Sequence, residues 1–247
     1  MINYSEFPTK YFGSKTDFKT EDPAIIRNRQ SKFRLNLVNF IDHLPQNARV
    51  LDAGCGNGKV TRMILSLRPD IRISAMDISD VSEYIPKLVD FKVGSVEDLS
   101  GLYSSEYFDA VISLHVIEHL LFPMRMINSI KFVLKKGGKM FLETPNWVRV
   151  YMPFSPNYFW NDYTHVRPFS KYSMNKLLTE FDFKNVKLIT TNTMSLISKN
   201  STESCCGVIK KQSEVKKDNN LKTMVGKIIL RLTHPLFKDI LIVEAEK

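Results

Sequence analysis

The sequence predicts an α/β fold in which one mostly parallel sheet of seven strands has helices packed on both of its faces. Two observations lead to this prediction. From residue 46 to residue 146, short apolar runs typical of buried strands alternate with runs of helical period. The first of these strands also ends in a glycine-rich turn that leads straight into a helix, as in doubly wound folds.

The composition suits one globular domain with its own core. The 247 residues are 43% apolar and 25% charged, which is ordinary for a soluble protein. Three cysteines, two of them adjacent, indicate a reducing compartment. The first residues show no signal-peptide pattern, and no apolar run approaches the ~18 residues of a membrane span. We therefore expect a cytoplasmic protein.

The elements follow in a regular order. A helix is expected over residues 22–44, because Asp22 can cap it and Pro23 suits its first turn, so residues 1–45 form an N-terminal arm and helix. The core over residues 46–146 then contains five strands: RVLDAG, IRISAMDIS, DFKVGSV, YFDAVISLHV and KMFLETPN. One helix covers residues 58–67. Another follows the fourth strand through Leu134, until the glycine pair of KKGG ends it.

Residues 147–172 interrupt this alternation with aromatic residues and three prolines, and we expect a packed insertion that forms a lid over the substrate. Residues 173–247 complete the single predicted domain. The helix KYSMNKLLTEF and the strands NVKLITTN and DILIVEAEK restore the pattern there. A polar and basic insertion over residues 198–238 separates the last two strands.

The net charge of +9 is concentrated in that insertion. Residues 199–238 hold nine Lys or Arg and three Asp or Glu, a surplus of six (9 − 3). The segment could contact an anionic membrane that carries a lipid-linked acceptor, or nucleic acid, or only solvent. Aromatic and basic residues lie in separate segments rather than interleaved, which makes nucleic acid an unlikely partner.

The glycine-rich turn lies in VLDAGCGNGK, residues 50–59. The dinucleotide pattern G-x-G-x-x-G would need glycine where Lys59 stands, and the G-K-S/T of a phosphate loop is absent. The stretch resembles motif I, D-x-G-x-G-x-G, of the class I S-adenosylmethionine-dependent methyltransferases, which have a Rossmann-like fold. The resemblance implies that S-adenosyl-L-methionine is the cofactor and that Asp52 orients its amino group. The cofactor would then approach the main chain closely at Gly54, Cys55, Gly56 and Gly58. A tight turn would also use glycines for its own geometry.

Three further segments resemble cofactor contacts of the same family. In AMDIS, Asp77 would bind the ribose hydroxyls and Ile78 would pack on the adenine; without the glycine turn, Asp77 would be read as a helix cap. In GSVEDL, Ser95 and Val96 stand where the family usually has aspartate and alanine in contact with adenine. Leu114, at the end of the fourth strand, would line the cofactor.

His115, Glu118 and His119 form the pattern H-x-x-E-H, which also occurs in zinc peptidases. Here the pattern starts at a strand end, and Glu118 and His119 match the usual E-H pair of the methyltransferases. The related ubiquinone-biosynthesis O-methyltransferases carry acids and histidines around this pair, and a divalent metal has been proposed there. A hydrogen-bonded network is the better explanation of the three residues, and we assign no metal ligands.

The lid sequence WNDYTHVRPFS, residues 160–170, supplies the candidate substrate site. It resembles an H-x-x-x-F segment of small-molecule and glycan methyltransferases. His165 is the candidate general base, with Asp162 holding its imidazole and His115 as a second candidate base. Arg167 would pair with an acidic group of the substrate, and Trp160 and Tyr163 would offer flat faces for a ring. Alternatively, His165 and Arg167 only fasten the lid to the body.

The resemblance therefore predicts an S-adenosylmethionine-dependent methyltransferase that methylates a hydroxyl of a small-molecule acceptor, a sugar or glycan intermediate. The alternative acceptors are a quinone-like or other small aromatic compound and, with less support, RNA. A regulatory protein that binds the cofactor without turnover is a third class, and the intact glycine turn with the residues of the lid argues against it.

Overall fold

A computed structural model of the chain describes residues 24, 35–151, 153, 157–191 and 238–247. The predicted N-terminal arm, the first half of the helix expected over residues 22–44 and nearly all of the basic insertion lie outside the described residues. The predicted contact of residues 199–238 with a membrane therefore remains a prediction. In the described part of the chain, no helix is both long enough and apolar enough to cross a bilayer.

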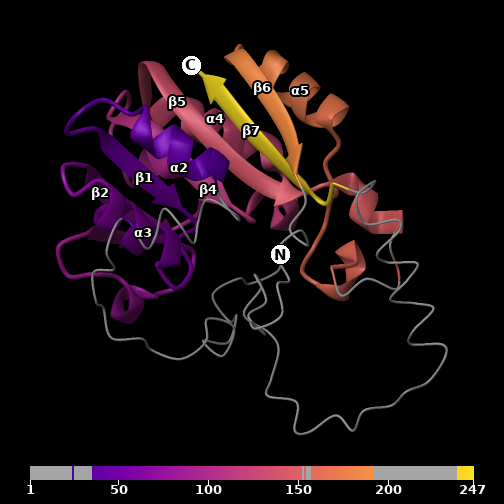
Figure 1. The fold of residues 1–247 in the computed structure, drawn as a ribbon, viewed down its shortest axis with the longest axis horizontal. Coiled ribbons are helices and arrows are strands. Elements are labelled where there is room, and N and C mark those ends of the chain that lie inside the picture. Colours follow the sequence, from indigo (N-terminus) through magenta and orange to yellow (C-terminus); the bar gives the residue numbers. More distant parts are fainter. Residues whose placement is uncertain (1–23, 25–34, 152, 154–156, 192–237) are drawn as a thin grey trace, which may run out of the picture.

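The seven predicted strands form one sheet with the order β3-β2-β1-β4-β5-β7-β6 (Figure 1). Their bounds are β1 Arg49–Ala53, β2 Arg72–Asp77, β3 Asp90–Val93, β4 Phe108–Leu114, β5 Leu134–Pro145, β6 Lys184–Thr191 and β7 Ile240–Glu246. The first five strands are parallel, whereas β7 runs antiparallel to both β5 and β6. The predicted α/β class with a mostly parallel sheet is confirmed.

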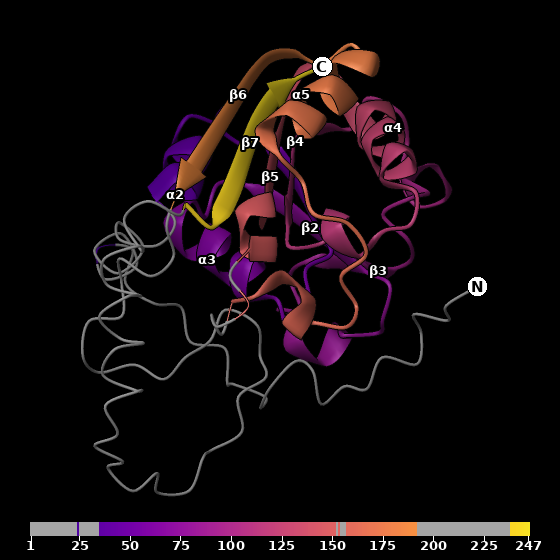
Figure 2. The same ribbon diagram turned by 90° about the vertical axis from the view of Figure 1, so that its right-hand side faces the viewer.

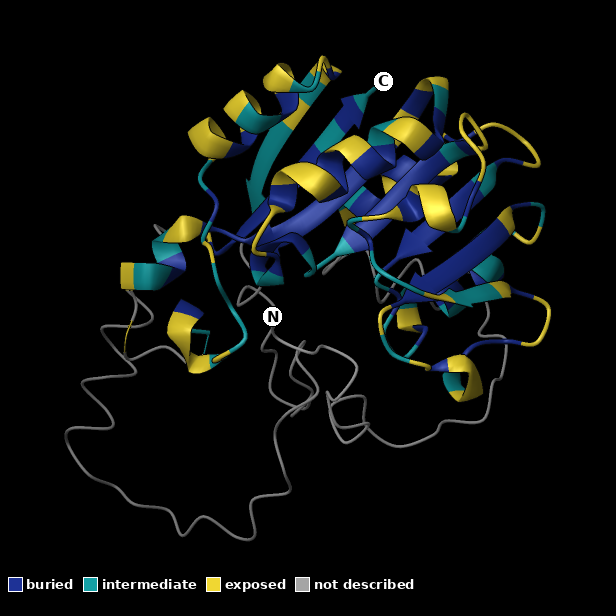
Figure 3. Ribbon diagram, turned by 180° about the vertical axis from the view of Figure 1, so that it is seen from behind, coloured by how far each residue is buried: buried dark blue, intermediate teal, exposed yellow. Residues whose placement is uncertain are grey.

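Helices cover both faces of the sheet, as the sequence predicts. Helices α2 (Leu35–Asp42) and α3 (Lys59–Leu67) pack on one face, and α4 (Pro123–Val133) and α5 (Lys171–Glu180) pack on the other. Successive residues of a strand enter opposite layers: Val50 joins the core under α2 and α3, and Leu51 joins the core under α4 and α5. In Figure 3 the helices turn buried residues toward the sheet and exposed residues outward.

Short 3₁₀ helices form most of the remaining regular structure. They are η3 Ser82–Tyr84, η4 Leu99–Gly101, η5 Ile117–His119, η6 Trp147–Tyr151 and η7 Phe159–Asn161. The last two belong to the predicted lid, residues 147–172. Because α5 already begins at Lys171, we call residues 147–170 the lid segment. It returns to the sheet through a bridge between Asn146 and Phe169. Helix α5 then begins with a capping box formed by Ser170 and Ser173.

One predicted boundary is wrong. The glycine pair of KKGG does not end the helix before it, because α4 ends at Val133 and β5 already begins at Leu134. Gly137 has a left-handed backbone (φ 72°) inside β5, where the register with β4 shifts. The pair therefore accommodates a bulge in a strand, a position that glycine favours as strongly as it favours a helix end.

Candidate active site

The candidate site lies where the parallel strands end. The glycine turn follows β1, Asp77 closes β2, and the segment from His115 to His119 follows β4. Figures 1 and 2 show the lid segment beyond the carboxyl ends of β4 and β5. In open α/β sheets this edge is where ligands bind.

The glycine turn after β1 has a backbone that other residues rarely adopt. Gly54, Gly56 and Gly58 have φ angles of 81°, 51° and 69°. Gly54 is also fixed by packing, because a Cβ at this position would lie 2.4 Å from Cγ2 of Val116. The N–H groups of Gly54 and Cys55 both donate to the carbonyl of Met76, at 2.9 and 3.0 Å, and so hold the turn against β2.

Asp77 joins this turn to the end of β2. Its Oδ2 accepts a hydrogen bond from the N–H of Gly56 at 2.9 Å, and its Oδ1 accepts one from the N–H of Ser79 at 3.1 Å. Burial raises the pKa of the carboxyl group, and the N–H groups that it accepts from act in the opposite direction. Next to it, the side chain of Ile78 is 40% exposed, which leaves an apolar face for an adenine ring.

The remaining predicted cofactor residues lie around the same turn. Asp52 is buried and accepts a hydrogen bond from the hydroxyl of Thr61 at 2.6 Å. Burial, with Asp52 and Asp77 nearby, raises the pKa of the Cys55 thiol, which keeps it neutral and unreactive. Ser95 accepts a hydrogen bond from the N–H of the residue two positions later, at 3.1 Å, and so also shapes its own turn.

The last two of these residues pack into the cores on opposite faces of the sheet. Val96 is buried in the core under α4 and α5, and Leu114 packs, partly buried, against the core under α2 and α3. The structure thus brings the predicted cofactor residues to one edge of the sheet. Their contacts with the cofactor remain predictions.

His115 lies between two buried carboxylates. Its Nδ1 lies 3.2 Å from Oε1 of Glu118, and its Nε2 lies 3.0 Å from Oε1 of Glu143. Burial on its own would lower the pKa of the imidazole, but the two carboxylates outweigh it and raise this pKa to about 9. At neutral pH both ring nitrogens therefore carry protons. An imidazolium has no lone pair to accept a proton, which favours a structural role over the catalytic role expected for His115.

This arrangement should make the stability of the protein depend on pH between about 6.5 and 9. Because the pKa of His115 rises from 6.5 to about 9 on folding, its stabilisation is complete below pH 6.5 and is lost as the pH rises through 9. We expect His115→Asn to lower the free energy of unfolding at pH 6.5 and much less at about pH 10, with a difference of roughly 2–3 kcal/mol. Asparagine tolerates the left-handed backbone of this position (φ 56°). Urea unfolding of wild type and variant at the two pH values measures this difference. A loss of unfolding free energy that is the same at both pH values would contradict the prediction.

The lid segment brings His165 to the same edge. The ring lies 4.5 Å from the ring of Phe159, and its Nδ1 lies 2.6 Å from the carbonyl oxygen of Phe159. A carbonyl only accepts, so Nδ1 carries the proton and the neutral ring has its lone pair on Nε2. Burial lowers the pKa of His165, which keeps the ring neutral at pH 7.

Asp162 does not hold His165 by a hydrogen bond, in contrast to the expected pairing. Its Oδ2 lies 3.8 Å from Nε2 of His165, beyond hydrogen-bond range. Its Oδ1 instead accepts from both the hydroxyl and the N–H of Thr164, at 2.5 and 3.0 Å. The hydroxyl oxygen of Thr164 in turn lies 2.8 Å from Nδ1 of His119. Asp162 is thus connected to His119, through the hydroxyl of Thr164.

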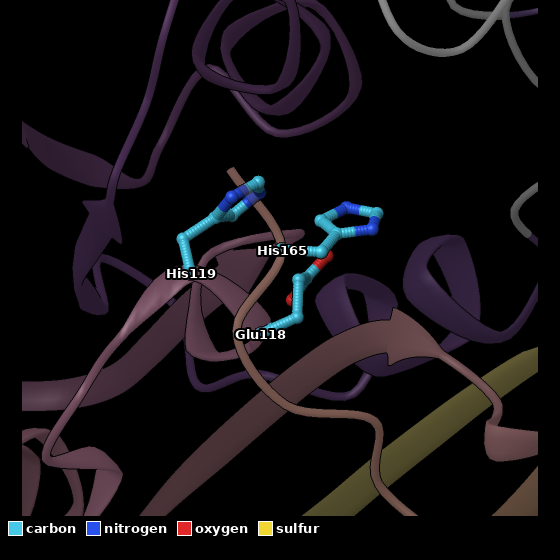
Figure 4. Close-up of side chains that lie close together, drawn as sticks. All are labelled: Glu118, His119 and His165. Atoms are coloured by element: carbon cyan, nitrogen blue, oxygen red, sulfur yellow. The ribbon is translucent and has the colours of Figure 1, made fainter. Parts of the chain in front are cut away.

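Glu118, His119 and His165 converge in one cluster (Figure 4). One ligand atom from each lies within 4.8 Å of the others. A carboxylate and two imidazoles can hold a divalent metal. However, the two oxygens of Glu118 already bond to His115 and to the hydroxyl of Thr144, the latter at 2.9 Å. Each oxygen of Glu118 thus already has a hydrogen-bond partner within the protein, and we interpret the cluster as an acid–base group.

Main-chain bonds and a buried ion pair attach the lid segment to the body. The carbonyl of Glu118 accepts hydrogen bonds from the N–H groups of Val166 and Arg167, at 2.8 and 3.2 Å. Arg149 and Asp239 form a buried pair at 3.3 Å, which ties the lid segment to the start of β7. The attachment therefore runs through the main chain of Arg167, and the residue itself is exposed.

The outer part of the lid segment presents aromatic side chains to solvent. Trp160 is 47% exposed and Tyr163 is 83% exposed. Trp160 also packs edge-on against Phe159, at 4.8 Å between ring centroids. Arg167, in the same segment, is exposed as well.

The sequence interpretation missed three residues of the site. Thr164 lies between Asp162 and His119, Glu143 is the second partner of His115, and Val116 packs on Gly54. Only Glu143 had a usable signal, because an acid inside an otherwise apolar strand must find a buried partner. The other two depend on segments that meet only in the folded chain.

A solved S-adenosylmethionine-dependent methyltransferase from Archaeoglobus fulgidus shares this fold. It superposes with a TM-score of 0.62 and 20% identity, over 89% of this chain and 98% of that chain. A phosphoethanolamine N-methyltransferase from Haemonchus contortus, solved with S-adenosylhomocysteine, superposes with a TM-score of 0.58 and 13% identity, over 86% of this chain and 52% of that one. The chain thus has the fold of the S-adenosylmethionine-dependent methyltransferases.

Sequence comparison places the chain in a family. Residues 25–188 match the model of a methyltransferase domain family, and the chain belongs to that family. A relative from Xanthomonas axonopodis pv. citri, named ubiquinone biosynthesis O-methyltransferase, is 36% identical over 110 residues, which are 41% of this chain and 45% of the relative. A protein of the same name from Xanthomonas campestris is 35% identical over 121 residues, 46% of this chain and 49% of the relative. The chain spans about half the length of the curated relatives it matches.

Proposed function

We propose that the protein transfers the methyl group of S-adenosylmethionine to the hydroxyl of a small aromatic, quinone-like acceptor. The observation that carries this proposal is the state of His165. Its neutral ring carries the lone pair on Nε2, and it lies in the same lid segment as the exposed Trp160 and Tyr163, near the strand ends where the cofactor would bind. Such a group can take the proton that a hydroxyl loses on methylation.

The cofactor supplies an already activated methyl group, so the residues of the chain have three tasks. The glycine turn, Asp77 and Ile78 would hold the cofactor with its sulfur toward the lid segment. Trp160 and Tyr163 would place the acceptor ring and exclude water from it. His165 would accept the hydroxyl proton on Nε2 as the new oxygen–carbon bond forms and the sulfur–carbon bond breaks.

Two arguments favour an aromatic acceptor over a sugar. The relatives from Xanthomonas are named for O-methylation in ubiquinone biosynthesis. A phenolic hydroxyl, with a pKa near 10, is also better matched to an imidazole base than the less acidic hydroxyl of a sugar. Sugars remain the second candidate, because the exposed faces of Trp160 and Tyr163 could stack on a sugar ring as well.

The experiment is a turnover assay with two acceptor panels, small catechols and nucleotide-sugars, in which the methylated product is identified by mass spectrometry. We expect a phenolic methyl ether from the first panel. Product from the nucleotide-sugars alone would replace the aromatic acceptor by a sugar. Loss of turnover with both panels would contradict both candidates.

The lid surface can be tested separately with a matched pair of tyrosines. Tyr163 in the lid segment is 83% exposed, and Tyr172 on α5 is 81% exposed. We expect Tyr163→Ser to raise the KM for the acceptor about tenfold, because it removes one aromatic contact. Tyr172→Ser should leave KM unchanged. Equal effects of the two substitutions would show that the lid surface does not bind the acceptor.

A further inference from the structure

Two hydrogen bonds meet at the hydroxyl of Thr164 and connect Asp162 to His119. They allow only one arrangement of protons. A carboxylate only accepts, so the hydroxyl of Thr164 donates its single proton to Oδ1 of Asp162, at 2.5 Å. The oxygen of Thr164 must then accept from Nδ1 of His119, at 2.8 Å. Neutral His119 therefore carries its proton on Nδ1 and its lone pair on Nε2.

His165 has the same tautomer for a different reason, since its Nδ1 donates to the carbonyl of Phe159. The rings of His119 and His165 lie 4.8 Å apart between centroids and are inclined by 53°. A ring nitrogen of each lies within 4.8 Å of the other, a span that one bridging water molecule can cover. Two imidazoles with the same tautomer thus lie next to each other.

We propose that His119 is the second proton carrier of the site and that Thr164 is the residue that positions it. The proposal rests on the proposed function. The acceptor hydroxyl gives its proton to Nε2 of His165, and a bridging water then relays a proton to His119, which accepts it on Nε2. His165 returns to its neutral form, and His119 becomes an imidazolium with protons on both nitrogens.

Asp162 stabilises that imidazolium through Thr164, because the hydroxyl that accepts from His119 is polarised by its bond to the carboxylate. His119, Thr164 and Asp162 thereby resemble an imidazole base that a carboxylate orients, with one hydroxyl inserted between the two. Glu118, which lies in the same cluster, adds a second negative charge near His119. The proton finally leaves His119 to solvent, which restores the starting state.

The first test needs no substrate. Nitrogen-15 NMR of histidine-labelled protein reports which ring nitrogen is protonated, and His119→Gln identifies its signals. We expect the proton of His119 on Nδ1 in the wild type and in Thr164→Ser, which keeps the hydroxyl. In Thr164→Val, which keeps the shape and removes the hydroxyl, the proton should distribute over both nitrogens. Wild-type protein with the proton on Nε2 would overturn the proposal, and so would a Thr164→Val variant with an unchanged tautomer.

The second test uses turnover on the accepted phenol. We expect Thr164→Val to lower kcat about tenfold at constant KM, and Thr164→Ser to restore it. Thr179→Val is the matched control, because it removes an exposed hydroxyl that bonds only to its own helix, at 2.8 Å from the carbonyl of Asn175. An unchanged kcat in Thr164→Val overturns His119 as a proton carrier. If wild-type protein methylates no phenol, the proposed function fails, and the tautomer measurement still decides the role of Thr164.

Discussion

Replacement of Asp77 by alanine should weaken the binding of S-adenosylmethionine about a hundredfold. The substitution removes both carboxylate oxygens that would accept from the ribose hydroxyls, and two hydrogen bonds to a charged group are worth about 3 kcal/mol. It also removes the acceptor of the Gly56 N–H, so the glycine turn loses its bond to β2. Calorimetric titration with S-adenosylhomocysteine measures the loss directly.

Asp80 provides the control for this prediction. It lies three residues further along, is exposed and accepts a hydrogen bond from the N–H of Ser82 at 3.0 Å. Asp80→Ala should bind the cofactor as the wild type does. If Asp77→Ala retained wild-type affinity, Asp77 would not be the residue that holds the ribose.

His165→Ala should reduce kcat by about a hundredfold to a thousandfold while the affinity for the cofactor stays unchanged. The effect follows from the loss of the proton acceptor, since the glycine turn and Asp77, and not His165, would hold the cofactor. His165 must be neutral to accept a proton, so the wild-type rate should fall as the pH is lowered. Because burial lowers the pKa of His165, this fall should begin below the usual titration range of histidine, which lies near pH 6.5. Steady-state kinetics across that range, with calorimetry of the variant, tests both statements.

His43 is the matched histidine for this comparison. It is exposed beyond the end of α2, and its Nδ1 lies 2.6 Å from the carbonyl of Asn39. His43→Ala should leave kcat and the pH profile unchanged. A His165→Ala variant that keeps wild-type kcat would remove His165 from catalysis, and the proton path through His119 would lose its first step.

The strands of the sheet could be predicted because residues close together in the sequence determine each of them. Each strand is a short apolar run, and the glycine turn and the acid after β2 lie next to the strands that position them. The KKGG pair was misassigned because a left-handed glycine serves a bulge and a helix end alike, and only the pairing of β5 with β4 distinguishes the two.

The candidate site was less predictable because its hydrogen bonds connect distant segments. His115 and Glu143 are 28 residues apart, and His119 and Thr164 are 45 residues apart. The sequence shows that acids and histidines occur near strand ends, but it does not show which acid meets which histidine. Asp162 is the clearest example: His165 lies only three residues further along the chain, but Asp162 is connected through Thr164 to His119.

The placement of β7 has a consequence for how the molecule reaches its native state. Among the strands that the structure describes, β6 pairs only with β7, and β7 pairs with β5, a strand about a hundred residues earlier in the chain. Until β7 arrives, the apolar edge of β5 stays open, and such an edge recruits strands from other chains. Contacts over so long a separation form slowly. We therefore expect refolding yield to fall with protein concentration, and substitutions in β7 to slow the closure of the sheet.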